Sequence, residues 1–588
     1  MPEPDHRFEL WAPHARDQVR LDLDGTARPM RRDPARPGWW QLDAPARPGA
    51  SRYGFRLDDD PTLLPDPRSR RQPDGPDGPS QLVDHTAFRW SAAPAAHPLP
   101  GSSIYELHIG TFTPEGTFEA AAARLDHLVA LGVDLVELMP VCPFPGTRGW
   151  GYDGVSLWAV HEPYGGPEGL KGFVDAAHRL GLGVVLDVVH NHLGPSGNYL
   201  PRFGPYFTER HHTPWGAAVN LDAPGSDEVR AYLIGSALAW LRDYRVDGLR
   251  LDAVHALVDT RATHLLEELA AAVDTLATAT GRPLFLIGES DLNDPRTTAP
   301  REAGGTGLAS QWSDDFHHAL HAALTGETQG YYADFAARPL AGLAKTLTRG
   351  WFHDGTWSSF RGRSHGRPFD TLRTPAHRLL GYLQTHDQVG NRALGDRLSP
   401  ALAPGLLAAG AALVLTSPFT PMLFMGEEWG AGTPWQYFTD HQDPGLAAAV
   451  REGRRGEFAA HGWKPEDVPD PQARETFLAS TLDWAEPGRE PHASLLAWYR
   501  TLLGLRRAHP ALADPDLASV RVEFDEADRW LVLHRGRCRT AVNLSPGPRT
   551  VPLGGAYADT LAAYGAPTPH RDTLTLPPAS AAVVRTAQ

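Results

Sequence analysis

The sequence predicts a multidomain α/β protein in which a central (β/α)8 TIM barrel lies between an N-terminal and a C-terminal β-sandwich. Both ends of the chain carry short alternating strands separated by turn residues. The middle alternates short, continuously apolar runs with longer amphipathic stretches, a pattern typical of repeated βα units. The length of 588 residues is sufficient for one large barrel and two smaller domains.

The two ends of the chain are each predicted to form a β-sandwich. Residues 1–95 are expected to be an immunoglobulin-like sandwich, and residues 511–588 a second antiparallel one. The expected N-terminal strands are residues 8–11, 19–23, 38–42 and 51–57. The expected C-terminal strands are residues 519–524, 529–535 and 539–544. Residues 61–80 are rich in Pro, Asp, Gly and Arg, which predicts an irregular connection.

Residues 96–510 are expected to form the barrel. Its strands are predicted at 104–109, 133–139, 183–190, 248–253, 284–289, 309–312, 380–386 and 412–416. Helices are predicted between them at 118–131, 170–180, 227–244 and 261–280. Residues of about 193–226 form a long insertion after the third strand, rich in Gly, Pro, His and aromatic residues. Long loops at the C-terminal face of a barrel usually serve the substrate.

Charge and composition restrict the classes of function. The chain has 55 basic and 70 acidic residues, and a net charge of −15 disfavours binding to nucleic acids. It shows neither a long apolar run nor a basic start followed by an apolar segment, so no membrane span or export signal is predicted and a cytoplasmic location is expected. Cys142 and Cys538 lie far apart in the sequence, and we interpret them as buried free thiols.

Polar side chains gather where four of the predicted barrel strands end. They are Asp187, Asn191 and His192, then Arg250, Asp252 and His255, then Glu289, then His386 and Asp387. Arg250 and Asp252 share one side of their strand, and the outward side would bury both charges against helices. A structural ion pair is the alternative interpretation of these two residues. With Glu289 and Asp387 at the same rim, however, three acids would face one arginine. Such an excess of negative charge does not stabilise a fold and therefore favours a functional interpretation.

Paired carboxylates in different environments are what the cleavage of a glycosidic bond requires. One acts as an ionised nucleophile, and the other is kept protonated as the acid. Asp252 is expected to stay ionised beside Arg250. Glu289 follows an apolar run close to other carboxylates, so desolvation and like charge are both expected to raise its pKa. Asp387 and the neighbouring histidines are then expected to bind sugar hydroxyls and to support an oxocarbenium-like transition state.

Two other kinds of hydrolase are weighed against this interpretation. His190 and His192 have the spacing of a metal site, to which His255 and His386 could contribute. The arginine beside the carboxylate of the fourth strand fits a metal site poorly. A Ser–His–Asp hydrolase is disfavoured because we find no Gly-x-Ser-x-Gly motif.

The motifs at these strand ends resemble those of the α-amylase family of retaining glycoside hydrolases. They are residues 187–192 (DVVHNH), 247–253 (DGLRLDA), 286–289 (LIGE) and 385–387 (THD), with 219–222 (VNLD) as a shorter fifth motif. With the sandwiches included, the resemblance covers nearly the whole chain. It implies that Asp252 is the nucleophile, Glu289 the general acid/base and Asp387 the transition-state stabiliser. The residues implied to line the subsite of the cleaved glucose are Tyr152, His192, Arg250 and His386.

Within this family the chain is most similar to the trehalose-forming branch. The similar segments include residues 149–154 (GWGYDG), 311–318 (QWSDDFHH), 386–392 (HDQVGNR) and 423–429 (LFMGEEW). The resemblance implies hydrolysis of the α-1,4 bond between a maltooligosaccharide and a terminal α,α-trehalose, together with functional pairing with a maltooligosyltrehalose synthase. Candidates for recognising the trehalose part of maltooligosyl trehalose are Trp215, His255, Gln311, Trp312 and Glu327, with loop packing as the alternative for each.

Neither a cofactor nor a metal is expected for this chemistry. Calcium in particular is doubtful, because the loop after the third strand lacks a clear cluster of acids. A glycogen-branching transferase and an isoamylase-type debranching enzyme stay open as alternatives, since both would share the same acids. A catalytically silent carbohydrate-binding protein is the non-enzymatic alternative, and the presence of all three acids speaks against it.

Overall fold

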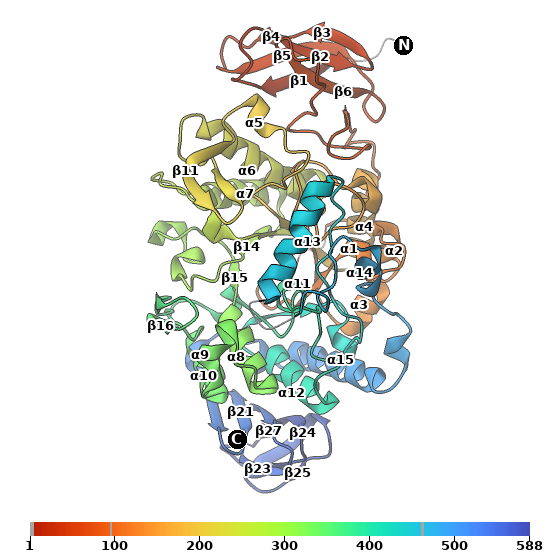
Figure 1. Ribbon diagram of the computed structural model, residues 1–588. Helices are drawn as coiled ribbons and strands as arrows, with labels where there is room; N and C mark the ends of the chain where they lie inside the picture. The colour runs from red at the N-terminus through yellow and green to blue at the C-terminus, as the bar shows by residue number, and fades with distance from the viewer. Residues whose placement is uncertain (1–4, 95–96, 460–463, 588) are drawn as a thin grey trace.

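The centre of the molecule is a closed parallel barrel, described in a computed structural model that covers residues 5–94, 97–459 and 464–587 (Figure 1). Its strands are β8 (Ile104–Leu107), β9 (Leu135–Leu138), β10 (Gly183–Val188), β13 (Gly248–Leu251), β14 (Phe285–Gly288), β15 (Ser310–Trp312), β18 (Leu379–Tyr382) and β19 (Thr420–Phe424). The predicted fold class is confirmed, and every predicted barrel strand except the last overlaps an observed one.

The last predicted strand, residues 412–416, is wrong. Those residues end α12 (Pro404–Leu415), and the strand that closes the barrel is β19, a few residues further on. From Leu407 to Leu415 every residue of α12 is buried, so the segment is a continuous apolar run without an amphipathic period. Such a run fits a buried helix as well as a buried strand, and periodicity cannot separate the two.

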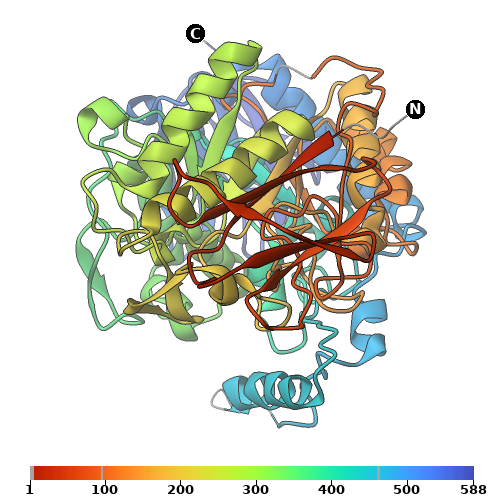
Figure 2. The same ribbon diagram turned by 90° about the horizontal axis from the view of Figure 1, so that it is seen from above.

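Helices pack around the barrel. The described helices longer than ten residues are α4 (Gly166–Arg179), α6 (Ser226–Asp243), α7 (Leu265–Thr280), α8 (Asp314–Thr325), α10 (Pro339–Arg349), α12, α13 (Pro444–Ala459) and α15 (His492–Ala508). The helix predicted at 118–131 is divided into α2 (Phe118–Ala122) and α3 (Leu125–Leu131). Figure 2 shows α13 standing at the outer edge of the molecule.

Antiparallel sheets lie at the two ends of the molecule (Figure 1). The N-terminal sheets contain β1 (Asp5–Trp11), β5 (Trp39–Pro45) and β4 (Arg31–Arg32), and β3 (Thr26–Pro29), β2 (Val19–Leu23), β6 (Arg52–Leu57) and β7 (Ser80–Gln81). The C-terminal sheets contain β20 (Arg521–Asp525), β21 (Trp530–Arg535), β22 (Cys538–Asn543), β27 (Ser580–Thr586) and β24 (Tyr557–Tyr564), and β23 (Arg549–Pro552), β26 (Thr573–Leu576) and β25 (Thr568–Pro569). The predicted domain boundary at residues 95 and 96 lies outside the described residues.

The inside of the barrel is apolar at one level and charged at the next. Ile104, Leu135 and Val185 belong to one buried apolar cluster. Two residues further along the same strands stand Glu106, Glu137 and Asp187, and because side chains alternate along a strand they point the same way. Strand register places Arg250 directly beside Asp187. The barrel therefore carries a layer of ionisable groups just below its carboxyl end.

Gly248 shows how tightly the apolar layer is packed. A Cβ atom at this position would come within 2.3 Å of the Phe285 ring on the neighbouring strand. The missing side chain leaves room for the ring inside the barrel. This packing supports Arg250, two residues further along β13.

After β10 the chain makes a long excursion over the residues of the insertion predicted at about 193–226. It contains α5 (Leu200–Phe203) and a hairpin of β11 (Phe207–Thr213) and β12 (Gly216–Val219). Cys142 and Cys538 are free and buried, as predicted. None of the described helices has the length and apolarity needed to cross a lipid bilayer.

Candidate active site

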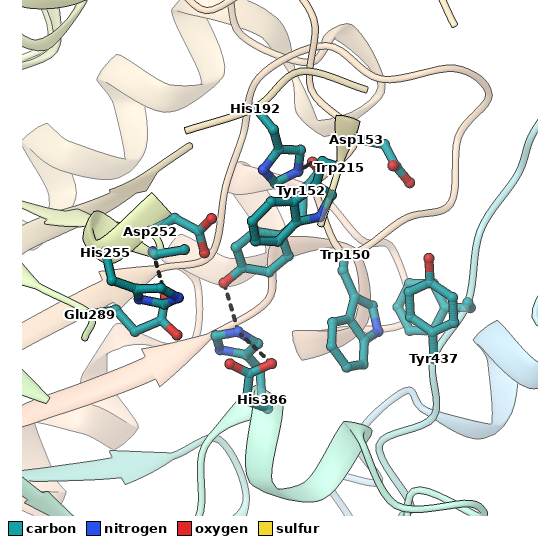
Figure 3. A pocket seen from close by; sticks show the side chains of 13 residues that line it. Trp150, Tyr152, Asp153, His192, Trp215, Asp252, His255, Glu289, His386 and Tyr437 are labelled. Atoms are coloured by element: carbon teal, nitrogen blue, oxygen red, sulfur yellow. Dashed lines mark hydrogen bonds and ion pairs between the residues drawn. The ribbon is translucent and has the colours of Figure 1, made fainter. Parts of the chain in front are cut away.

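A pocket of about 390 Å³ opens above the charged layer, at the carboxyl ends of the barrel strands (Figure 3). The predicted residues that line it are Tyr152, His192, Trp215, Asp252, His255, Glu289, His386 and Asp387. It is completed by Trp150, Asp153, Ala253, Tyr437 and Phe438, which the sequence analysis did not single out. Strand-end residues far apart in the sequence thus meet in one pocket, as the barrel hypothesis requires.

Arg250, predicted to line the glucose subsite, lies buried beneath this pocket and is not among the residues that line it. Its side chain is fully buried, and its guanidinium contacts three carboxylates. Nη1 lies 2.8 Å from Asp187 Oδ2 and 2.9 Å from Asp252 Oδ1, while Nη2 lies 3.0 Å from Glu289 Oε2. The face of Trp312 lies 4.4 Å from the guanidinium carbon on another side. One cation therefore sets the mutual position of the two acids proposed for catalysis.

Asp252 comes directly after β13, where the chain turns sharply. Ala253 adopts a left-handed conformation with φ of 39°, which is uncommon for a residue with a side chain. Asn191 donates from Nδ2 to Asp252 Oδ2 at 2.6 Å and to the Asp252 carbonyl oxygen at 2.8 Å. Together with Arg250, these bonds fix the carboxylate from two sides and leave it facing the pocket.

Glu289 follows β14 and reaches the same place from the neighbouring strand. Its Oε2 accepts a hydrogen bond of 2.6 Å from the backbone N–H of Ala253. Burial raises the pKa of Glu289 to about 8, and the charges of Asp252 and Asp387 act in the same direction against the attraction of Arg250. The group is therefore protonated at neutral pH, as the sequence analysis predicted from desolvation and like charge.

Tyr152 and His386 stack on each other beside the acids, with ring centroids 5.1 Å apart. Tyr152 is placed by a turn at Gly151, whose φ is 100° and where a Cβ atom would lie 2.2 Å from the Pro140 carbonyl oxygen. Only glycine fits there. His386 and Asp387 begin α11 (His386–Gly390).

Asp187 ties this stacked pair to Arg250. Its Oδ2 accepts a hydrogen bond of 2.6 Å from the Tyr152 hydroxyl, and both of its oxygens accept from Arg250 Nη1. Burial raises the pKa of Asp187 to about 6 although Arg250 opposes the shift. The sequence analysis placed Asp187 at the strand end without giving it a role, and its position shows that it orients both Arg250 and Tyr152.

Aromatic side chains form two further walls. Trp215, in the turn between β11 and β12, is 49% exposed and stacks on His192 with ring centroids 4.4 Å apart and parallel planes. Trp150 contacts Tyr437 edge to face at 5.3 Å. In Figure 3, Trp150 and Tyr437 lie on the side of the pocket opposite Asp252, Glu289 and His255.

Three of the predicted trehalose-side residues lie away from the pocket lining. Gln311 and Trp312 are buried on β15, and Trp312 packs under Arg250. Glu327 forms an ion pair with Arg392 at 2.9 Å and a hydrogen bond with His321 at 2.9 Å. These contacts match the packing alternative considered for them. Tyr437 and Phe438 were missed because they come from a loop after the last strand, where no strand-end pattern marks them.

The described residues contain no group of three or more His, Cys, Asp or Glu side chains arranged to hold a metal ion. His192 faces the pocket, whereas His190 is buried and is not among the residues that line it. The two histidines of the predicted metal spacing therefore do not converge on one point of the pocket.

Comparisons with known proteins place the barrel among the α-amylases. Residues 79–206 match the family model described as the α-amylase catalytic domain, and residues 515–583 match a domain of unknown function. The chain is 54% identical to malto-oligosyltrehalose trehalohydrolase of Rhizobium sp. (strain M-11), over 98% of this chain and 97% of that protein. It is 56% identical to the protein of the same name from Arthrobacter ramosus, over 95% and 96%. The chain belongs to the malto-oligosyltrehalose trehalohydrolase family.

A solved structure agrees with this assignment. The crystal structure of a putative α-amylase from Salmonella typhimurium is 40% identical in sequence and superimposes with a TM-score of 0.89. The match covers 100% of this chain and 99% of that one. The arrangement of barrel and flanking sheets is thus common to both proteins over their full length.

The expected roles of Asp252 and Glu289 can be told apart by substrates with different leaving groups. Asp252→Asn and Glu289→Gln should each lower kcat on a maltooligosaccharide-type substrate by about three to six orders of magnitude. The fluoride ion of α-maltosyl fluoride leaves without being protonated. Glu289→Gln should therefore still form the glycosyl–enzyme ester on Asp252 rapidly with this substrate, whereas Asp252→Asn should not form it. Pre-steady-state release of fluoride measures this difference.

The thermal unfolding of both variants serves as the control. Unfolding midpoints within a few degrees of the unsubstituted protein show that the losses are chemical. Fluoride release by Asp252→Asn at the rate of Glu289→Gln would contradict the assignment of roles.

The pH dependence of kcat/KM is expected to be bell-shaped. Activity should fall as the pH rises through about 8, because Glu289 loses the proton that it donates. It should also fall as the pH decreases through about 6, because Asp187 becomes protonated and its contacts with Arg250 weaken. Initial rates measured at low substrate concentration test this, with circular dichroism at each pH as the control for folding. A rate that stays constant well above pH 8 would contradict the role of Glu289.

Proposed function

We propose that the protein hydrolyses the α-1,4-glucosidic bond next to the terminal α,α-trehalose of maltooligosyl trehalose, with retention of configuration, and releases trehalose and a maltooligosaccharide. The observation that carries the retaining cleavage in this proposal is the carboxylate pair on Arg250, in which Glu289 is protonated while Asp252 stays in contact with the cation. The relatives that share about half of its residues bear the name of this activity.

The mechanism follows from the positions of the acids. Asp252 attacks the anomeric carbon of the glucose that lies against Tyr152, while Glu289 gives its proton to the oxygen that leaves with trehalose. The glycosyl–enzyme ester is then hydrolysed by water that the ionised Glu289 deprotonates, so the acid regains its proton. Asp387 lies at the same rim and is suited to interact with the sugar ring as positive charge develops on it.

The direction in which the substrate lies follows from the same chemistry. The leaving trehalose must lie on the side of the acid, and the glucan that stays bound to Asp252 must extend away from it. His255 lies beside Glu289, whereas Tyr437 and Trp150 stand at the far side (Figure 3). We assign His255 and the exposed Trp215 to the trehalose side, and Tyr437 to the glucan side.

We also propose the division into domains at 1–95, 96–510 and 511–588, which agrees with the separation of the described sheets from the barrel.

A substrate that ends in two glucose units joined through their anomeric carbons must be made by another enzyme. Pairing with a maltooligosyltrehalose synthase, in the cytoplasm, is therefore part of the same proposal. A glycogen-branching or α-1,6-debranching activity is the second candidate, because the acids alone do not distinguish it.

Product analysis decides between these candidates. The purified protein should release free trehalose from maltooligosyl trehalose much faster than it releases any maltose from maltohexaose, because the trehalose side of the pocket receives a 1,1-linked disaccharide. Chromatography of both reactions measures this. Equal cleavage of both substrates, or transfer products in place of trehalose, would contradict the trehalohydrolase specificity and favour the alternatives.

The assignment of Tyr437 makes a second prediction. Tyr437→Ala should lower kcat/KM for maltosyl trehalose by up to about tenfold, because a second glucose loses its stacking partner. Glucosyl trehalose places only one glucose on that side, so its kcat/KM should hardly change. Tyr437→Phe retains the ring and is the matched control. An equal loss on both substrates would show that Tyr437 acts on the pocket as a whole.

A further inference from the structure

Two glutamates stand side by side inside the barrel, below the pocket. Glu106 on β8 and Glu137 on β9 are partners in the strand register, and both are fully buried. Their surroundings differ. Glu106 contacts His386, whereas neither carboxyl oxygen of Glu137 has a hydrogen-bond partner among the described residues. Neither glutamate lines the pocket, so any role of theirs must act through another residue.

Glu106 holds His386 with both of its oxygens. Oε1 lies 2.5 Å from the ring nitrogen Nδ1, and Oε2 accepts a hydrogen bond of 3.0 Å from the backbone N–H of the same residue. The residue is thereby held at its ring and at its backbone. The second ring nitrogen, Nε2, points to the Tyr152 hydroxyl at 2.7 Å.

The hydrogen-bond sequence defines the protonation of this ring. The single proton of the Tyr152 hydroxyl is directed to Asp187 Oδ2, which also accepts from Arg250 and so behaves as a carboxylate. The tyrosine oxygen must then accept from His386 Nε2, while Nδ1 donates to Glu106. His386 consequently carries protons on both nitrogens.

We infer that Glu106 is a positioning residue of the hydrolase, which keeps His386 as an imidazolium oriented toward the substrate. The inference rests on the proposed function and extends it to the layer below the pocket. The imidazolium fixes the Tyr152 hydroxyl beside the glucose that lies on Tyr152, and its charge balances the carboxylates of the pocket. A neutral ring could serve only one of its two neighbours as a donor.

The charges that face His386 from each packed element support this. Burial disfavours the charged ring, but the carboxylates of Glu106 and Asp387 and the hydrogen bond to Glu106 outweigh it and raise the pKa of His386 to about 9. Burial raises the pKa of Glu137 far above its usual range, so that carboxyl stays neutral. The remaining ionisable groups around the ring are Asp187, Arg250, Tyr152 and His108.

The test compares Glu106→Gln with Glu137→Gln, two isosteric changes at neighbouring buried positions. Glu106→Gln keeps a hydrogen-bond acceptor for Nδ1 but removes the charge, so the pKa of His386 should return toward its ordinary value near 6.5. At pH 8 the protonated fraction, and with it kcat/KM, should fall about 30-fold. The alkaline limb of the pH profile should move to lower pH. Glu137→Gln should leave both unchanged.

Nitrogen NMR of histidine-labelled protein gives a readout that does not depend on activity. In the unsubstituted protein the His386 ring should stay doubly protonated up to about pH 9, and in Glu106→Gln it should lose a proton near neutrality. If Glu106→Gln does not fold, Glu106→Asp keeps the charge and should keep the alkaline limb in place while lowering kcat.

Three results would overturn the inference. They are a His386 ring that titrates near pH 6.5 in the unsubstituted protein, an unchanged alkaline limb in Glu106→Gln, or an equal shift in Glu137→Gln. The proposed function is judged separately, because release of trehalose by the unsubstituted protein does not depend on either variant. A protein that releases no trehalose but shows the NMR difference would retain the role of Glu106 in orienting His386 and lose the assigned substrate.

Discussion

The arrangement of the site depends on the buried guanidinium of Arg250. It contacts Asp187, Asp252 and Glu289 within 3.0 Å, and all three come from different barrel strands or their ends. Burying so many charges costs more than an apolar core of the same size would, and a single cation does not balance them. Because stability alone would favour an apolar layer here, we infer that the charged layer serves the chemistry of the pocket. It places Asp252 and Glu289, which we propose as nucleophile and acid, on one rigid support, which loops could not do with the same precision.

Burial, together with the crowding of carboxylates in this layer, determines which acids keep their protons. Arg250 and the imidazolium of His386 lie close to Glu106, Asp187, Asp252, Glu289 and Asp387, and the carboxyls cannot all be ionised together. Glu289, whose pKa burial raises to about 8, and Glu137, whose carboxyl oxygens have no hydrogen-bond partner among the described residues, remain protonated at neutral pH. The protonated state of Glu289, the acid we propose, is thus a consequence of its burial and of the neighbouring carboxylates in the barrel.

Much of this organisation could be predicted from the sequence, for physical reasons. The acids stand at strand ends, and side-chain alternation fixes that Arg250 and Asp252 share a side. The end of α12 is mistaken for the eighth strand because a fully apolar segment shows neither the helical nor the strand periodicity of hydrophobic residues. Tyr437 comes from a loop whose course depends on tertiary packing. Glu106 lies within a strand, where a single acid in an apolar run gives no sign that a histidine nearly 300 residues away will contact it.

The two ends of the pocket are built differently, and this bears on specificity. On the side that we assign to the glucan, Trp150 and Tyr437 form an edge-to-face pair, and the Trp150 indole N–H donates to the Gln436 carbonyl oxygen, which anchors the pair. Trp215, which we assign to the trehalose side, stands in a hairpin turn, half exposed and stacked on His192. A rigid wall suits a repetitive α-1,4 glucan whose units are alike. A residue on a hairpin can be exchanged with little effect on the barrel, so selection of the leaving group is separable from the acids that cleave the bond.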